Sequence, residues 1–322
     1  MTNASPSRSE LYKTITDRIV AALDAGVRPW LRPWSPSPTE GSLQRPMRAN
    51  GTPYTGINVV LLWSEAAAKG YASRLWMTRK QAQSLHARIA DSAQGATVVF
   101  GRRFTRSTSG PKGELVEASA GFLKAFTVYN GDLIDGLPER CLRLAEPARP
   151  AGQPIHRAEC LFAAAGADIR HGGSRAFYAP DLDFIQLPPF DAFRSAESYA
   201  ATKAHELAHW TGHRARLDRR FHDCKRFGSD GYAFEELVAE LSAAFVCADL
   251  GIESEVRADH EAYLGHWVSV LRNDTRNIFT AASHAQRAAD FLLAAAGRSA
   301  AGDALHPDCT QARCGGLERS AV

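Results

Sequence analysis

The sequence has 322 residues, of which 45% are apolar, and its formal net charge at pH 7 is +3. This length accommodates two domains of ordinary size. No uninterrupted apolar run approaches the roughly 18 residues that a membrane span requires, and the N-terminal residues lack the apolar core of a signal peptide. We therefore expect a cytoplasmic protein with no membrane partner. The six cysteines are scattered without a C-x-x-C pair, so they are interpreted as free thiols.

The net charge conceals an asymmetry between the two halves of the chain. Residues 1–150 contain 20 Lys and Arg against 12 Asp and Glu, a balance of +8, and the remainder contains 18 against 23, a balance of −5. The basic half also holds four of the six tryptophans. Arginines that follow phosphates and rings that stack on bases are typical of single-stranded nucleic-acid surfaces. A tryptophan-rich core beneath a solvated basic face is the alternative that composition leaves open.

The first predicted element is a helix over 7–26, which opens with capping-box spacing and ends at a glycine. Prolines then make 27–38 an extended arm that carries Trp30 and Trp34. A turn that contains Tyr54 leads into an amphipathic helix. If the basic half binds single-stranded DNA, we expect these three rings to stack on the bases.

Two β-branched and aromatic runs, 96–105 and 121–130, predict strands joined by a long mobile loop of polar residues. Arg102, Arg103 and Arg106 lie at the end of the first strand and the start of this loop. We expect these three arginines to contact the phosphates of bound DNA.

A proline-rich segment over 139–154 ends the basic region and predicts a linker. Beyond it come a helix, two short strands and then, from about residue 195, an almost wholly helical stretch. Residues 298–322 contain too few apolar side chains to fold and are predicted to be a disordered tail. The sequence thus predicts an α+β protein, with an N-terminal α/β domain over 1–138 and a mostly helical domain with a small sheet over 155–297.

The segment AHELAHWTGH, residues 204–213, contains the pattern H-E-x-x-H. On a helix, His205 and His209 stand about 40° apart around the axis and ~6 Å along it, so both imidazoles reach one metal ion. Glu206 stands beside them, where it acts on a water bound to that ion. His213 lies ~12 Å along the axis from His205 and is not expected to join them. The metzincin pattern also fails, because Ala215 occupies the position of its third histidine.

A catalytic zinc takes three protein ligands, and we expect the third from the segment EELVAE. Glu236 and Glu240 have a spacing that resembles the gluzincin partner helix, where one glutamate ligates zinc and an acid four residues on bonds a ligand histidine. We therefore assign Glu236 to the metal and Glu240 to a histidine, with Glu235 as the reserve ligand. Tyr232, one turn before Glu236, is either a group that stabilises an oxyanion or an ordinary aromatic at a helix start.

Such a centre holds one Zn2+ ion, with another divalent metal such as Mn2+ as the alternative. Zinc lowers the pKa of a bound water towards neutrality, Glu206 takes the proton, and the hydroxide attacks a carbonyl that the metal polarises. The predicted strand over 183–189 precedes the metal helix and is expected to align the substrate.

Several segments in one order carry a resemblance to a known family, namely NGTPYTGIN (50–58), FTVYNGDLIDGLP (126–138), HELAHWTGH, EELVAEL and YLGHWVSVLRNDTRNIFTAAS (263–283). The chain resembles the ArdC-type antirestriction proteins of conjugative plasmids, which are related to the N-terminal part of plasmid TraC primases. The resemblance covers about residues 8–293. It implies a single-stranded-DNA-binding domain followed by a zincin-like metallopeptidase domain, and a role in protecting incoming plasmid DNA from host restriction.

Two functions of different classes follow. In the first, the protein is a metalloprotease that cuts host restriction enzymes or other DNA-bound proteins. In the second, it coats single strands, and its metal site is structural or a relic. The retained Glu206 favours the first, because a purely structural site does not need a base. A role as a primase accessory factor rests only on the TraC resemblance, since the sequence contains no polymerase or phosphate-cradling motif.

Overall fold

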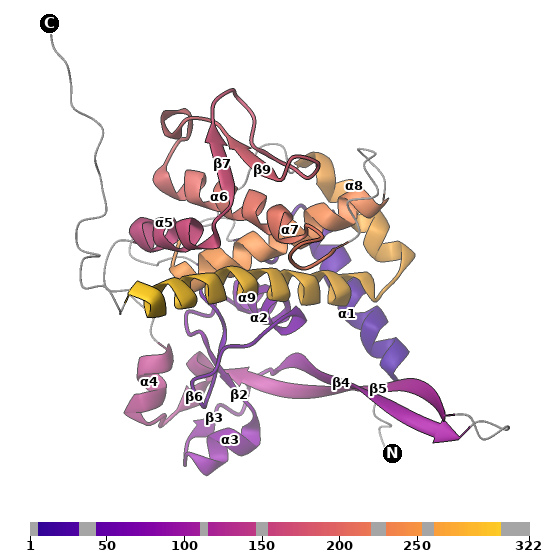
Figure 1. Ribbon diagram of the computed structural model, residues 1–322. Coiled ribbons are helices and arrows are strands. Elements are labelled where there is room, and N and C mark those ends of the chain that lie inside the picture. Colours follow the sequence, from indigo (N-terminus) through magenta and orange to yellow (C-terminus); the bar gives the residue numbers. More distant parts are fainter. Residues whose placement is uncertain are drawn as a thin grey trace, which may run out of the picture.

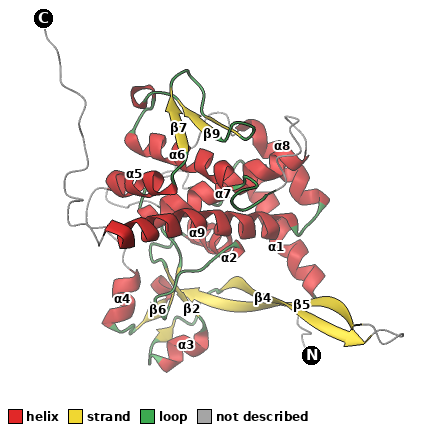
Figure 2. Cartoon of the chain, in the orientation of Figure 1, coloured by secondary structure: helices red, strands yellow, loops and turns green. Residues whose placement is uncertain are grey.

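The computed structural model of the chain describes residues 6–31, 43–109, 115–145, 154–219, 230–252 and 261–303. Figures 1 and 2 show a largely helical part that carries a small sheet, and beneath it a smaller part from which a long two-stranded hairpin projects. Helix and strand are thus both present in each part, and the predicted α+β class is confirmed.

The first helix, α1 (Arg8–Asp24), begins with a capping box. The Ser7 hydroxyl accepts a hydrogen bond from the Glu10 N–H, and the Glu10 carboxylate accepts one from the Ser7 N–H. The apolar stripe of α1 is buried against α8 (Glu261–Asn273), near the other end of the chain. The Thr16 hydroxyl adds a hydrogen bond of 2.7 Å to the carbonyl of Thr275.

The remaining elements of the N-terminal part are β1 (Met47–Arg48), α2 (Ile57–Lys69), β2 (Leu75–Met77), α3 (Arg79–Ser84), β3 (Arg88–Ile89), β4 (Ala96–Ser109), β5 (Leu115–Asn130), η1 (Gly131–Leu133), β6 (Ile134–Asp135) and α4 (Glu139–Ala145). One sheet has the strand order β1-β2-β5-β4, and only its β1–β2 pair is parallel. A second, two-stranded sheet pairs β3 with β6.

The β4–β5 hairpin is longer than the sequence predicts. The two strands pair without interruption from Ala96 opposite Val128 to Ser109 opposite Leu115. The predicted long loop is therefore wrong, and Arg106 lies within the ladder, opposite Ala118. The threonines, serines and valines of this polar stretch suit a strand, and cross-strand pairing satisfies their backbone groups.

The outer edge of β4 is covered at Val99 by the side chain of Asn58, on α2. The Asn58 amide nitrogen donates to the Val99 carbonyl, and the Asn58 amide oxygen accepts from the Val99 N–H, each at 2.8 Å. An edge strand otherwise presents such groups to other chains. This contact fixes the hairpin to the helix beside it.

The C-terminal part consists of α5 (Pro154–Ala165), β7 (Asp168–His171), β8 (Phe177–Ala179), β9 (Phe184–Leu187), η2 (Phe190–Ala192), α6 (Ala196–Thr211), α7 (Asp230–Leu250), α8 and α9 (Asn277–Asp303). Its sheet has the order β7-β9-β8, with β9 parallel to β7 and antiparallel to β8. Helix α7 is buried along almost its whole length, between α6, α8 and α9. Among the described residues, no helix combines the length and the apolar character needed to cross a bilayer.

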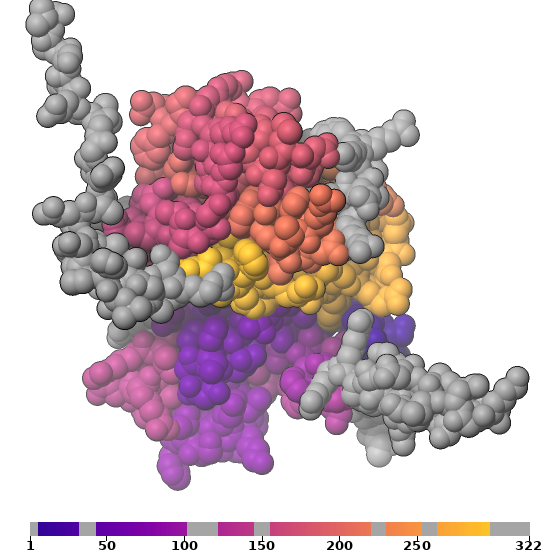
Figure 3. All heavy atoms as spheres, in the orientation of Figure 1, coloured from indigo at the N-terminus to yellow at the C-terminus, as the bar shows by residue number. Residues whose placement is uncertain are grey.

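One apolar cluster extends through both parts of the molecule. Trp30 meets Trp267 edge to face with ring centroids 6.0 Å apart, and Trp63 meets Phe245 at 5.8 Å. Figure 3 shows the N-terminal part, in indigo to purple, in contact with the yellow helix α9 and the C-terminal part above it. The two parts therefore share one core.

Polar contacts reinforce this shared core. Two nitrogens of the buried Arg45 guanidinium each lie 3.1 Å from a carboxylate oxygen of Asp249, and a third lies 2.9 Å from the side-chain oxygen of Gln286. The same Gln286 oxygen accepts a hydrogen bond from the Gly56 N–H. A residue of α7 and a residue of α9 thus bind the backbone and one arginine of the N-terminal part.

The predicted domain bounds, 1–138 and 155–297, stay a prediction. Within the predicted linker over 139–154 the chain forms α4 and the first residue of α5. Helix α9 continues to Asp303, six residues into the predicted tail over 298–322, and residues 304–322 lie outside the described residues.

Candidate metal centre

Helix α6 brings two imidazoles together. Its N-cap is Ser195, whose hydroxyl accepts a hydrogen bond from the Ser198 N–H, and its C-cap is Gly212. Much of this helix consists of alanine, which favours helix formation, and the small alanine side chains let the helix pack closely in the core. On this helix the Nε2 atoms of His205 and His209 face each other at 3.1 Å.

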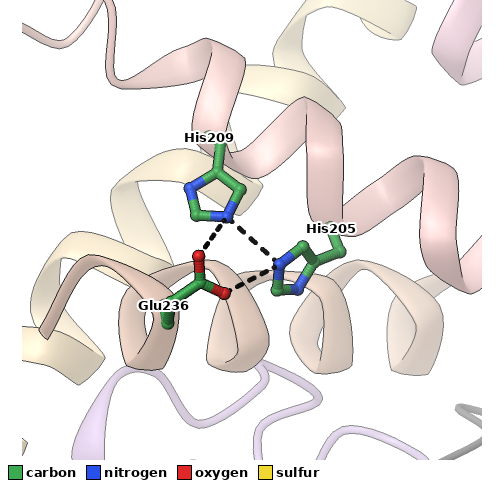
Figure 4. A group of neighbouring side chains, drawn as sticks. All are labelled: His205, His209 and Glu236. Carbon is green, nitrogen blue, oxygen red and sulfur yellow. Dashed lines mark hydrogen bonds and ion pairs between the residues drawn. The ribbon is translucent and has the colours of Figure 1, made fainter. Parts of the chain in front are cut away.

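Helix α7 supplies a carboxylate to the same point. Figure 4 shows the Glu236 side chain pointing at the two imidazoles, one oxygen toward each. Its oxygens lie 3.5 Å from His205 Nε2 and 3.5 Å from His209 Nε2. One donor atom from each of these three residues lies within 4.8 Å of the others.

The spacing of these donors fits a divalent cation. An ion that binds its ligands at about 2.05 Å in tetrahedral geometry separates any two of them by about 3.3 Å. The two imidazole nitrogens lie 3.1 Å apart, and each lies 3.5 Å from a different oxygen of Glu236, so the three residues surround one point at close to this separation. Two imidazoles and one carboxylate are also the donor set of catalytic zinc sites that leave one position for water.

Carboxylates also lie behind the two imidazoles. The Nδ1 atom of His209 lies 3.3 Å from a Glu235 oxygen, and the Nδ1 atom of His205 lies 3.7 Å from a Glu240 oxygen. Such partners fix the orientation of a ligand ring and raise its basicity. Glu235, the reserve ligand in the sequence analysis, thus lies behind His209, on the side away from Glu236.

Arg219 holds Glu235 in place, and sequence reasoning missed it. Its guanidinium donates to both Glu235 oxygens, at 3.2 and 2.7 Å, and its side chain is fully buried. It also donates to the Thr211 hydroxyl and the Ala208 carbonyl at the end of α6. A buried glutamate requires a cation, but the arginine-rich segment after α6 gives no sign of which arginine supplies it.

The charges of the centre depend on one another. Burial opposes ionisation of Glu235, but Arg219 and His209 outweigh it and lower the pKa of this carboxyl to about 2. Burial also opposes the charge of Glu236, and the two imidazoles nevertheless hold its pKa well below the usual range. For His209, burial lowers the pKa, but Glu236 and Glu235 reverse this effect and raise it to about 10. Both carboxylates are therefore charged at neutral pH, as metal binding requires.

Three further residues of the sequence analysis lie on or after these helices. Glu206 is buried on α6, directly after His205. The Tyr232 hydroxyl lies 3.3 Å from the hydroxyl of Tyr263, and burial followed by the charge of Glu236 raises its pKa, so it stays protonated. His213 follows the end of α6, where its Nδ1 accepts a hydrogen bond from the Ala215 N–H.

The strand expected to align a substrate is the wrong one. The segment over 183–189 forms β9, which is the middle strand of its sheet, with β7 on one side and β8 on the other. Its backbone groups are therefore already paired, and a substrate strand cannot join it. The outer strands of this sheet are β7 and β8.

The structure also corrects two predicted DNA contacts. The Trp30 ring has no exposed surface, and Tyr54 is buried beneath the Arg48 guanidinium, which lies 4.6 Å from its ring centroid. Neither ring is available to stack on a base. Trp34 lies outside the described residues. The side chains of Arg102, Arg103 and Arg106 lie outside them too, although the backbone places all three within β4.

Two family models match the chain. Residues 9–129 match the N-terminal domain of anti-restriction factor ArdC, and residues 156–284 match a zincin-like metallopeptidase. A Sinorhizobium fredii protein designated y4eC is 39% identical over 294 residues, which cover 89% of this chain and 92% of that protein. An Escherichia coli DNA primase TraC is 36% identical over 302 residues, but these cover 89% of this chain and only 27% of the primase.

Two solved structures resemble the whole arrangement. The metal-free crystal structure of the antirestriction protein ArdC from plasmid R388 has a TM-score of 0.74 and 42% identity, and the match covers 90% of this chain and 98% of that one. The Mn(II)-bound crystal structure of the same protein has a TM-score of 0.70 and 41% identity, and that match covers 89% and 98%.

Proposed function

The chain belongs to the ArdC antirestriction family, and from this premise we propose that it binds single-stranded DNA and carries a zinc peptidase centre that acts on proteins at that DNA. Its setting is the cytoplasm, where it protects incoming plasmid DNA from host restriction enzymes. The triangle formed by His205, His209 and Glu236 supports the peptidase proposal most strongly.

His205, His209 and Glu236 would hold the ion. When bound, a divalent cation supplies a Lewis acid that polarises a carbonyl and makes a neighbouring water more acidic. Zinc suits two nitrogen donors and one carboxylate at these separations. The related R388 protein has been crystallised with Mn(II), which is the alternative ion.

Side chains near the metal ligands would carry out the proton transfer, stabilise the developing charge and orient the ligands. The Glu206 carboxylate accepts the proton of the attacking water and returns it to the leaving amine. The protonated Tyr232 hydroxyl donates a hydrogen bond to the oxygen that gains charge on the attacked carbonyl. Glu235 holds the His209 imidazole in the orientation that a bound ion needs, and the Glu240 carboxylate, 3.7 Å from His205 Nδ1, is the charged neighbour of the second imidazole.

The proposal for DNA rests on family membership and on charge. The family model over 9–129 falls within the half of the chain whose balance is +8. Arginines and lysines in such a half attract the phosphate backbone, and the attraction weakens as salt rises. We place DNA binding in residues 1–138 and the peptidase centre in residues 155–297.

Replacing Glu206 by Gln tests the catalytic part. The full-length protein is incubated with the subunits of a host restriction endonuclease, with and without single-stranded DNA. We expect fragments that disappear on chelation of the metal, and we expect Glu206→Gln to abolish them while its zinc content, measured by atomic emission, stays unchanged. The amide keeps the shape of the side chain but cannot accept the proton.

Two outcomes contradict parts of this proposal. If Glu206→Gln protects incoming DNA as well as the parent, catalysis has no part in antirestriction, and coating of single strands takes its place. If the purified protein contains Mn2+ and excludes Zn2+, the choice of ion is wrong although the ligands stand.

A further inference from the structure

Three phenylalanines lie exposed on the β4–β5 hairpin, outside the core. Phe100 is 56% exposed, Phe122 is 39% exposed and Phe126 is 45% exposed. Figure 1 shows this hairpin extending away from the helices, with β4 and β5 side by side. Exposing three large rings on one hairpin is unfavourable in water unless something else covers them.

The register places the three rings on one face. Phe100 pairs with Lys124, and side chains that are directly opposite in a ladder share a face. Phe122 and Phe126 lie two residues to either side of Lys124, so they share that face as well. The rings of Phe100 and Phe122 lie 5.9 Å apart with an interplanar angle of 49°, too tilted to stack on each other.

Positive charge accompanies these rings. The Lys124 ammonium lies 6.0 Å from the centroid of the Phe122 ring, and Arg102 is the residue that pairs with Phe122 in the ladder. Residues 96–130 contain three arginines and two lysines against two glutamates, a balance of +3. A face that carries exposed rings beside a lysine ammonium, on a hairpin whose sequence is net positive, suits a polyanion with flat apolar parts better than it suits an apolar protein surface.

We propose that this face of the hairpin, with Phe100, Phe122 and Phe126, is the platform on which bases of single-stranded DNA stack. The inference rests on the proposed function, because it assigns a site to its DNA-binding part. The bases lie on the phenylalanine rings, and Lys124 pairs with the backbone phosphates. Recognition of this kind tolerates any base sequence, because every base has a flat face.

Two other features of the molecule agree with this assignment. Trp30 and Tyr54, the rings that composition favours, are buried and cannot stack on a base. The Asn58 side chain covers the edge of β4 at Val99, so the face of the hairpin rather than its edge is open at that point.

The test uses the full-length protein and a fluorescent 20-nucleotide oligo-dT. In Phe100→Leu/Phe122→Leu both rings are lost and apolar side chains are kept. Each stacked ring contributes at least about fivefold to affinity, so the double variant should bind about 25-fold or more weakly. The control is Phe177→Leu, which changes a 41%-exposed phenylalanine on β8 and should bind like the parent.

A second measurement gives a signal of binding at the site. The five tryptophans in the described part of the chain are buried or nearly so, so a Phe122→Trp variant adds an exposed indole to this face. We expect oligo-dT to quench this added fluorescence, while a Phe177→Trp variant shows no such quenching.

The outcomes separate the inference from the proposed function. If the parent does not bind oligo-dT, the DNA part of the proposed function fails, and this inference fails with it. If the parent binds and the double variant binds equally well with normal metal content, this inference alone is overturned. It is also overturned if the double variant keeps its DNA affinity and loses self-association in light scattering, because the face is then an interface between two copies.

Discussion

His209 shows at the scale of one residue what sequence spacing predicts and what it omits. The four-residue spacing to His205 predicts that the two rings share one face, because helix geometry alone decides it. The acid spacing on the next helix likewise predicts which glutamate faces them. Arg219 cannot be predicted, because it reaches Glu235 only after the chain has turned back across the end of α6.

This arginine offers a test of how the outer partners support the metal. Arg219→Lys keeps the positive charge but loses the two parallel hydrogen bonds to Glu235. Glu235 then holds His209 less firmly, and we expect zinc affinity to fall about 10- to 100-fold. Competition with a fluorescent chelator measures this affinity at a temperature where near-UV circular dichroism shows both proteins to be folded.

Arg216→Lys is the matched control for this substitution. Arg216 also follows α6 and donates to the Trp210 carbonyl at the end of that helix, but its carboxylate partner is Asp183 and not a neighbour of the metal ligands. Its zinc affinity should equal that of the parent. Zinc binding by Arg219→Lys as tight as that of the parent would contradict the role given to Arg219.

At the scale of elements, helices were easier to predict than strands. Helix α1 carries its own start signal in Ser7 and Glu10, and its apolar stripe repeats with the helical period. The outer part of the β4–β5 ladder, residues 106–109 and 115–120, has no comparable local signal, because its polar residues gain their structure from pairing across the hairpin. For the same reason the sequence does not reveal that β9 is a central strand, since that depends on β7, which was not predicted.

Asn58 provides the prediction that belongs to this scale. Asn58→Ala removes both hydrogen bonds to Val99 and leaves the backbone N–H and C=O of that residue without their partner at the edge of β4. We expect the free energy of unfolding, measured with urea, to fall by about 1–3 kcal/mol. Because an uncovered edge can pair with another chain, the variant should also aggregate at a lower concentration.

Asn50→Ala serves as the comparison. Asn50 accepts hydrogen bonds from the Thr52 N–H and hydroxyl in an exposed turn, so its loss should change the free energy of unfolding less. If the two alanine variants have the same stability and solubility as the parent, the hydrogen bonds to Val99 do not hold the hairpin to α2.

At the scale of the whole molecule, the charge asymmetry of the sequence suggests two independent domains, but the structure joins the two parts through one core. The apolar stripe of α1 predicts that this helix packs against another element. It does not predict that the partner is α8, which lies some 240 residues further along the chain. Composition cannot supply this information, because long-range contacts depend on the shape of the complete core.

Dividing the chain tests the shared core. A fragment of residues 1–150 lacks the partners of Trp30, Trp63 and Arg45, so we expect it to bind hydrophobic dyes and to lack near-UV circular dichroism. Co-expression with residues 151–322 should restore a soluble, folded complex. A cooperative urea transition of the first fragment by itself would show that its own contacts suffice.

The shared core also limits how such a sequence can be inherited. A recombination event that separated the two halves would leave each protein product with apolar core residues exposed to water, because the residues that cover them would be missing. Separation of the two halves is therefore expected to give products that do not fold. The similarity to the TraC primase agrees with this, because it spans 89% of the present chain within 27% of a much larger protein.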